Sequence, residues 1–237
     1  KFGPIIRRES DYRTYINLFT HNNSYISGYK KIYYRMFFKN KSEKELYNIY
    51  INSKDNFKNV IFNIEGLGNY FKPILKSNNL IFSELKSILS DYRFNNVNDN
   101  YIGVHLRYGD FITTNQNTEH DFYVNILKQI RSKFSNYPIR IFSDGNYKEF
   151  KWAIEDYNAY HVKSKSALSD ILDMSRSNLL IGTANSTYSA WASFLGRMPV
   201  LWPEEHKLAY LYYDKPSLER KISNKDTIPS IILDSLL

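Results

Sequence analysis

From Tyr101 onward, short apolar segments alternate with longer segments in which apolar residues recur every three or four positions. The apolar segments are residues 101–106, 139–143, 159–162, 178–182 and 199–202, and the segments with helical spacing are 122–134, 147–154, 167–177 and 186–195. Strands that alternate with helices over short connections are typical of a parallel sheet with helices on both faces. The pattern therefore predicts an α/β fold, with a Rossmann-like unit over residues 101–205.

The first hundred residues have less regularity and are rich in Asn, Lys, Tyr and Phe. Helical spacing over 41–51, an apolar strand at 60–64 and a turn at 65–69 are the elements that the pattern predicts there. We therefore divide the chain into a mostly helical N-terminal region, residues 1–100, and a Rossmann-like C-terminal domain, residues 101–237. Because the chain does not begin with Met, we expect that sequence upstream of it is missing.

Polar side chains follow three of the predicted strands at the point where each strand ends. His105, Arg107 and Asp110 follow the first strand, Ser143 and Asp144 follow the second, and the segment GTANSTYS follows the fourth at residues 182–189. Ligands of open parallel sheets bind beyond the carboxyl ends of the strands, so these residues are the candidate site. Arginine and a helix N-terminus with hydroxyl side chains both bind phosphate oxygens, which favours a phosphorylated ligand.

Each of these residues also has a structural interpretation. Arg107 can form an internal ion pair with Asp110, and His105 and Asp110 can be a hydrogen-bonded pair that closes the strand. Ordinary N-capping explains one hydroxyl in the last segment. It does not explain three hydroxyls and an amide together.

Composition narrows the classes of function. Of the 237 residues, Lys and Arg number 32 and Asp and Glu 24, so the net charge is +8, which suits nucleic acid, an anionic lipid surface or a phosphorylated substrate. There is no Cys, which excludes disulfides and thiolate metal sites. No GxGxxG or GxxxxGK[ST] motif occurs after a predicted strand, the five His have no ligand spacing, and no nucleic-acid recognition module is evident. We expect no metal, no cofactor and no nucleic-acid partner.

Two segments resemble a known family. HLRYGD at 105–110 resembles the HxRRxD motif of fucosyltransferases that use GDP-fucose, and ANSTYSAWASFLG at 184–196 is similar to the NSxxSxWxAxL stretch of the bacterial alpha-1,2-fucosyltransferases. IFSDG at 141–145 resembles a strand of that family that ends in an acidic turn beside the nucleotide. The similarity covers residues 60–205, in the order of the family.

The resemblance implies a GT-B-like, inverting glycosyltransferase that needs no metal and transfers fucose from GDP-fucose to a glycan acceptor hydroxyl. It further implies a role in surface polysaccharide or O-antigen synthesis, and we expect acceptor specificity to lie in residues 1–100. The sequence shows no signal-peptide pattern and no apolar segment long enough to span a bilayer, so we expect a cytoplasmic location. The excess of basic residues adds peripheral association with the inner face of the membrane as an option. Carried over by position, Arg107 would bind the diphosphate and act in catalysis, and His105 would support it. The remaining residues that would line the donor side are Ser143, Asp144, Asn185, Ser186, Thr187 and Ser189.

Inverting transfer also needs a general base, usually a carboxylate. Asp110, Glu119 and Asp121 follow the first strand, and we favour Asp110 because it belongs to the motif. The sequence departs from the family at Tyr108, where the motif has its second arginine, and it lacks the N-terminal GGxGNQ loop. Two alternatives therefore stay open, namely a glycosyltransferase that uses another nucleotide sugar and a non-catalytic relative that binds a nucleotide or a glycan.

Overall fold

The computed structural model divides the chain into two compact units, which are described separately below. One unit is residues 21–73, and the other is residues 1–20 together with 74–237. The structure describes residues 26, 28–42, 45, 59–63, 70–88, 100–108, 118–163, 167–208, 211–212 and 214–237. The domain boundary at residue 100 and an acceptor role for the region before it stay predictions.

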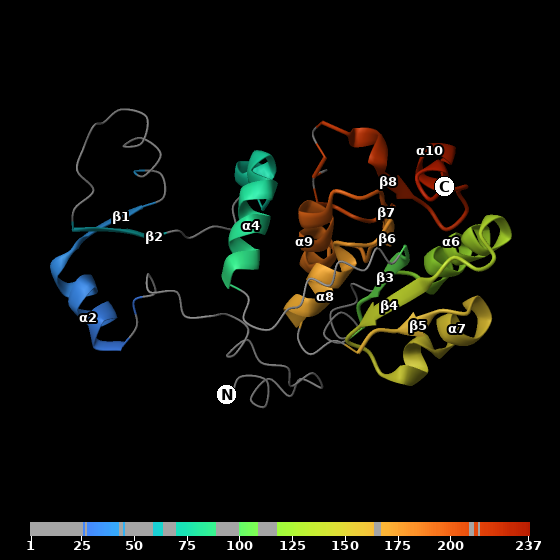
Figure 1. Cartoon of the computed structure of the whole chain (residues 1–237), viewed down its shortest axis with the longest axis horizontal. Helices are drawn as coiled ribbons and strands as arrows, with labels where there is room; N and C mark the ends of the chain where they lie inside the picture. The colour runs from blue at the N-terminus through green and yellow to red at the C-terminus, as the bar shows by residue number, and fades with distance from the viewer. Residues whose placement is uncertain are drawn as a thin grey trace. The chain divides into compact units, whose positions relative to one another are not determined.

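The larger unit contains a six-stranded parallel sheet in the order β5-β4-β3-β6-β7-β8 among its described residues (Figure 1). The strands are β3 Ile102–Leu106, β4 Ile139–Ser143, β5 Tyr160–His161, β6 Leu179–Ile181, β7 Val200–Pro203 and β8 Glu219–Ile222. All five residues of β3 are buried, because helices cover both faces of this central strand. Val104 pairs with Ile141 of β4 on one side and with Ile181 of β6 on the other. The predicted parallel α/β fold is thus confirmed.

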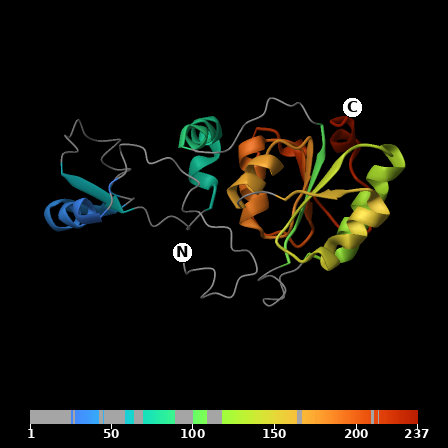
Figure 2. The ribbon, with the colours of Figure 1, turned by 60° about the horizontal axis from the view of Figure 1, so that its bottom comes forward.

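Helices lie on both faces of the sheet (Figure 2). One face carries α6 His120–Lys133, α7 Tyr147–Tyr157 and α10 Ser230–Asp234, and the other carries α8 Ala167–Met174 and α9 Thr187–Gly196. Helix α4, Asn78–Ile88, packs against α9, and Asn78 Nδ2 donates a hydrogen bond to the carbonyl oxygen of Phe194 over 3.4 Å. Two short 3-10 turns, η2 Lys72–Ser77 and η3 Pro216–Leu218, complete these elements. None of the helices that the structure describes has the length and apolar character to cross a bilayer.

The order of the strands fixes where a ligand can enter. From β3 the chain runs outward through α6 to β4 and through α7 to β5, and it then returns through α8 to β6 on the opposite side of β3. The connections therefore leave β3 and β6 in opposite directions. Such a topological switch point opens a crevice at the carboxyl ends of the two strands, which is where open parallel sheets bind ligands.

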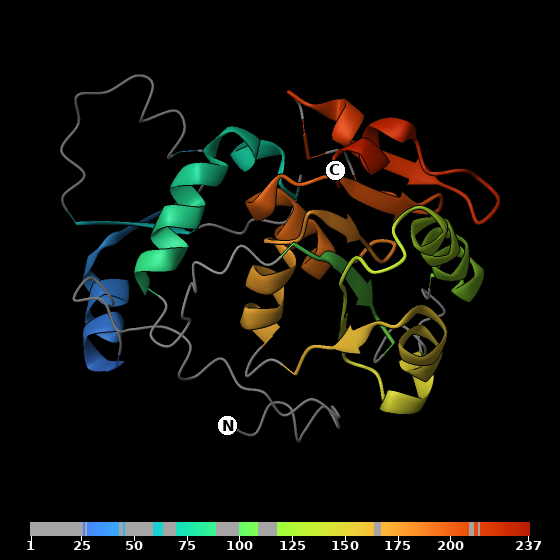
Figure 3. The same cartoon turned by 45° about the vertical axis from the view of Figure 1, so that its right-hand side comes forward.

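The smaller unit contains α2 Gly28–Phe37, which leads into β1 Lys39–Ser42 (Figure 3). Strand β1 pairs in parallel with β2, Val60–Asn63, which confirms the predicted strand at 60–64. The helix predicted over 41–51 is wrong for its first two residues, because their backbone groups pair with β2 instead. Apart from Glu45, which is helical, the rest of that helix and the turn at 65–69 lie outside the described residues.

Gly196 is needed for close packing and not for a left-handed backbone conformation. It is the last residue of α9, and the residue that adopts the left-handed conformation after the helix is Arg197, at φ 52°. A Cβ on Gly196 would overlap the backbone carbonyl oxygen of Ser175 and come within 2.8 Å of Met198 Sδ. Gly196 is thus required for close packing between the ends of α8 and α9.

The close approach at Gly196 predicts that Gly196→Ala lowers stability, whereas helix propensity predicts that it raises stability. Propensity alone predicts that Gly196→Ala stabilises the helix by about 1 kcal/mol. We expect the overlap with Ser175 to reverse this, so that the variant loses about 2 kcal/mol of unfolding free energy in urea titrations. Lys128→Ala, at an exposed position of α6, is the control and should change stability little. A Gly196→Ala variant as stable as the wild type would contradict the packing role.

Candidate functional site

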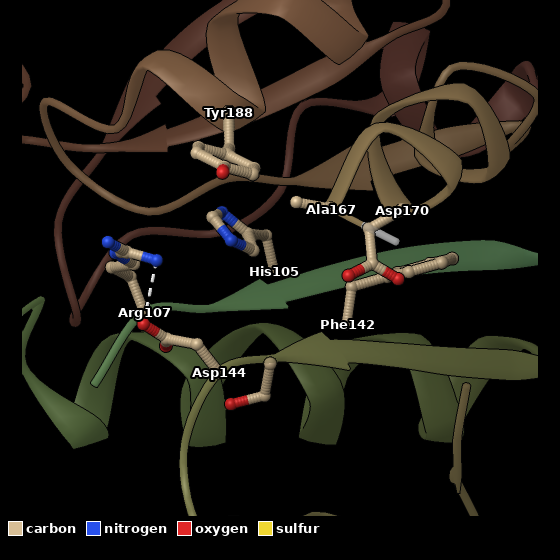
Figure 4. Close-up of a pocket in the computed structure, with 8 residues that line it drawn as sticks. His105, Arg107, Phe142, Asp144, Ala167, Asp170 and Tyr188 are labelled. Carbon is tan, nitrogen blue, oxygen red and sulfur yellow. Dashed lines mark ion pairs between the residues drawn. The ribbon is translucent and has the colours of Figure 1, made fainter. Parts of the chain in front are cut away.

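An open pocket of about 300 Å³ lies at the carboxyl ends of β3 and β4 (Figure 4). Strands β3 and β4, the first turn of α8 and the first turn of α9 all contribute side chains to it. The residues that line it are His105, Arg107, Phe142, Ser143, Asp144, Ala167, Asp170 and Tyr188. Four residues of the predicted site, His105, Arg107, Ser143 and Asp144, thus come together at the predicted edge of the sheet.

Arg107 is held by an acidic and an aromatic neighbour. Its Nη1 lies 2.7 Å from Oδ2 of Asp144, and its guanidinium carbon lies 5.5 Å from the ring centre of Tyr188. The backbone N–H of Tyr108 donates to the other carboxylate oxygen of Asp144 over 2.9 Å, which fixes the carboxylate. The alternative partner considered for Arg107, Asp110, lies outside the described residues. An arginine has five N–H donors, so Arg107 can hold Asp144 and a phosphate oxygen together.

His105 is buried, and its hydrogen bonds determine which ring nitrogen carries the proton. Its Nδ1 lies 2.6 Å from Ser189 Oγ, and that oxygen also accepts the backbone N–H of Thr183 over 3.2 Å. We therefore assign the Ser189 hydroxyl proton to the bond with Nδ1, which places the ring proton on Nε2. Burial and the nearby Arg107 charge lower the pKa of His105 to about 3. The ring is thus a neutral N–H donor beside the pocket.

Hydrogen bonds join the ends of β3, β4 and β6. The carbonyl oxygen of His105 accepts the hydroxyl groups of Thr183, over 2.8 Å, and of Tyr123, over 3.2 Å. Burial raises the pKa of Tyr123, so that it stays a phenol donor. On the other side, Ser143 Oγ donates to the carbonyl oxygen of Leu106 over 2.8 Å and accepts the N–H of Gly145 over 3.0 Å. Ser143 therefore shapes the rim of the pocket.

The loop between β6 and α9 is held by a neighbouring segment of the chain. Asn185 has φ 55°, its backbone N–H donates to His206 Nδ1 over 3.1 Å, and its side-chain oxygen accepts the N–H of Lys207 over 2.7 Å. Ser186 is the N-cap residue of α9 without a side-chain capping hydrogen bond, and Thr187 is exposed. None of these three residues lines the pocket, and their predicted contacts with the donor stay predictions.

Behind that loop, a buried cluster positions His206. Its ring stacks on Trp202 with centres 4.1 Å apart, and Trp202 Nε1 donates to Glu219 over 3.0 Å. The other oxygen of Glu219 accepts the backbone N–H groups of Leu211 and Tyr212. Burial and the charge of Lys221 lower the pKa of His206 to about 4. His206 is therefore neutral at pH 7, with Nδ1 able to accept the Asn185 N–H.

Asp170 and Tyr188 are pocket residues that the sequence patterns did not single out. Asp170 is a buried carboxylate on α8 and lies beside Phe142 (Figure 4), and the Tyr188 ring stacks against His105 with centres 6.2 Å apart. Tyr188 lies between the predicted site residues Thr187 and Ser189, so its position in the sequence could have identified it as a pocket residue. Asp170 lies in the segment with helical spacing at 167–177, but the sequence did not indicate that its side chain is buried. Across the ranges described, no three His, Asp or Glu residues are grouped so as to hold a metal ion.

The fold and the pocket define a Rossmann-like α/β domain that presents a fixed cation at the carboxyl ends of β3 and β4. The sequence matches glycosyl transferase family 11 over residues 12–200, and the chain belongs to this family. The resemblance to alpha-1,2-fucosyltransferases is thereby confirmed.

Comparison with solved structures finds POFUT1 in several states. The complex with GDP at high resolution has 15% identity, covers 65% of this chain and 59% of that chain, and has a TM-score of 0.36. The complex with GDP-fucose has 17% identity, covers 55% and 46%, and has a TM-score of 0.31. The chain thus spans about half the length of these structures. TM-scores this low transfer no residue role to this chain, and no curated protein matches it.

The lowered pKa of His206 predicts a pH dependence of stability. Because the folded pKa of about 4 lies below the ordinary 6.5, the unfolded chain binds the proton first as the pH falls. This contribution to stability is complete above pH 6.5, and we expect it to decline by roughly 2 kcal/mol by about pH 5. Asn at this position can still accept a hydrogen bond but does not titrate. Urea unfolding of wild type and His206→Asn across this range should show a shallower decline in the variant, and parallel declines would contradict the assignment.

Proposed function

We propose that this chain is a fucosyltransferase that transfers fucose from GDP-fucose to a hydroxyl group of a glycan acceptor. Its membership of glycosyl transferase family 11 supports the reaction class. The observation that carries the proposal is the position of Arg107 in the pocket at the carboxyl ends of β3 and β4, where it is paired with Asp144 and faces Tyr188. A role in surface polysaccharide or O-antigen synthesis is part of the proposal.

Arg107 binds the diphosphate in this proposal. As the bond between the sugar and the β-phosphate oxygen breaks, the leaving GDP takes the electron pair and negative charge develops on that oxygen. A cation already oriented by Asp144 stabilises this charge without rearranging during the step. Arg107 therefore supplies the charge stabilisation that other transferases obtain from a divalent cation, and the proposed reaction is independent of metal.

Asp170 gives the pocket a means of recognising guanine. Guanine presents N1–H and a 2-amino group side by side, and a carboxylate can accept hydrogen bonds from both. Uracil presents one N–H between two carbonyl groups, and the carbonyl oxygens would be repelled by the carboxylate oxygens of Asp170. His105 of β3, as a neutral N–H donor, complements this acceptor in the same pocket lining. The pocket therefore favours GDP over UDP in the proposal.

Inversion requires the acceptor hydroxyl to attack the sugar carbon from the side opposite GDP while a base takes the hydroxyl proton. Asp110 is the proposed base, and it lies outside the described residues. Glu119 accepts a hydrogen bond from Asn224 over 3.0 Å, and Asp121 is exposed in the first turn of α6. Neither lines the pocket, so both fit the role less well.

Tyr108 supports the second candidate, a transferase that uses another nucleotide sugar. Its hydroxyl donates to the carbonyl oxygen of Glu149 over 3.2 Å and its ring packs against the core, so it does not line the pocket. A Cβ on Gly145 would lie 2.6 Å from this ring, so the tyrosine and the glycine fit closely. Tyr108 thus does not supply the charge of the family's second arginine. A nucleotide sugar other than GDP-fucose is compatible with this loss of charge.

Binding of GDP tests the role of Arg107. In calorimetric titrations with EDTA present, we expect Arg107→Ala to weaken GDP binding about 10- to 100-fold, because a hydrogen-bonded charge pair is lost. Arg107→Lys should recover only part of the affinity, since an ammonium group lacks the planar fork. Arg220→Ala, at an exposed position of β8, is the matched control. Unchanged GDP affinity in Arg107→Ala would refute the diphosphate site, and GDP-fucose transfer by the wild type would then be assayed separately.

The preference for a guanine over a uracil nucleotide tests the role of Asp170. We expect Asp170→Asn to weaken GDP binding at least about tenfold and to reduce the preference for GDP over UDP, because an amide offers one acceptor where the carboxylate offers two. Asp173→Asn lies on the same helix outside the pocket lining and is the matched control. Tighter binding of UDP than of GDP by the wild type would favour the second candidate instead.

A further inference from the structure

Helix α2 of the smaller unit has an apolar face that is open to solvent. Five large side chains on this helix are between 55% and 79% exposed, and the helix has no buried residue. These residues are Tyr29, Ile32, Tyr33, Met36 and Phe37. At 100° per residue they occupy one continuous side of the helix. Isolated exposed apolar residues are ordinary, but five on one face form a docking surface.

The other side of α2 contacts its own unit. Tyr34 is the least exposed residue of the helix, and its ring packs edge-on against Phe38 with centres 4.5 Å apart. Phe38 connects α2 to β1. Tyr34 and Phe38 therefore lie on the side of α2 opposite the apolar face.

Cations border the apolar face, and acidic residues are absent from this segment of the sequence. Lys30 follows Phe37 around the helix on one side, and Arg35 lies beyond Ile32 on the other. Lys39 and Lys41 come next in β1. The sequence has no Asp or Glu between Asp11 and Glu43.

We propose that α2 is an interfacial helix that lies flat on an anionic lipid bilayer, with its apolar face among the headgroups and upper acyl chains. An apolar stripe flanked by Lys and Arg is the pattern of such helices, because the basic side chains reach the lipid phosphates while their stems cover apolar surface. Two tyrosines on the face suit the polar and apolar boundary of a bilayer. A second copy of the chain would bring these cations against one another, which makes self-association through this face unfavourable.

This inference does not depend on the proposed fucosyl transfer. The described α2 residues lie outside the pocket lining, so substitutions on α2 should leave GDP binding unchanged. Circular dichroism of each α2 variant is the check that the variant is folded, because α2 and the pocket belong to different units. Loss of lipid binding with intact GDP binding separates the two proposals.

Vesicle flotation tests the docking surface with the full chain. We expect binding to vesicles of phosphatidylcholine mixed with phosphatidylglycerol, weak binding to phosphatidylcholine alone, and release at about 0.5 M salt. The pair Ile32→Ser and Met36→Ser, and separately the pair Lys30→Glu and Arg35→Glu, should each reduce binding at least about tenfold. Lys128→Glu with Lys225→Glu changes the net charge equally at exposed positions elsewhere and should reduce it far less. Equal losses in the two charge variants, or no vesicle binding by the wild type, would overturn the proposal.

A site-specific label separates insertion from other contacts of the same face. Because the chain has no Cys, Met36→Cys can be labelled with an environment-sensitive fluorophore at a single position. We expect a blue shift on adding the anionic vesicles, and none for the same label at Leu80→Cys, an exposed apolar position on α4. A shift that depends on protein concentration without lipid would indicate a second copy and would overturn the membrane assignment.

Discussion

Burial of β3 on both faces is the constraint on which the site depends. A strand enclosed in this way leaves polar groups at its end with little access to water, and each must find a partner within the protein. The carbonyl oxygen of His105 has Thr183 and Tyr123, the ring has Ser189, and the carbonyl oxygen of Leu106 has Ser143. These bonds draw the ends of β3, β4 and β6 together. The pocket is thus a consequence of how the sheet satisfies its own polar groups.

The same constraint explains why the site has few ways to rearrange. Arg107 and Asp144 hold one another, and the Tyr108 N–H holds Asp144, so moving the cation would leave two partly buried charges unpaired. On the far side, the loop that begins α9 depends on His206, which rests on Trp202 and through it on Glu219 of β8. A chain of contacts that ends at β8, the last strand of the sheet, therefore holds this loop in place.

The sequence predicted most of the sheet and half of the pocket, for a physical reason. Strands β3 and β4 are mainly apolar because β3 is buried throughout and β4 is largely buried, and the polar residues at their ends mark the site without further information. Helix α4 and strand β8 were not predicted. Strand β8 (Glu219–Ile222) is mainly polar, and its buried Glu219 is a residue type that is usually found on the surface. Asp170 was missed for the same reason. Whether a carboxylate is buried depends on packing between distant segments, which periodicity does not encode.

The fit of Tyr108 against Gly145 bears on how this chain diverged from its family. The tyrosine ring occupies the space that a side chain at Gly145 would need, and its hydroxyl caps the Glu149 carbonyl in α7. An arginine at position 108 would exchange this aromatic packing for a charge beside the core. The tyrosine and its neighbours thus constrain one another, and an arginine here would need changes at Gly145 or in α7 as well.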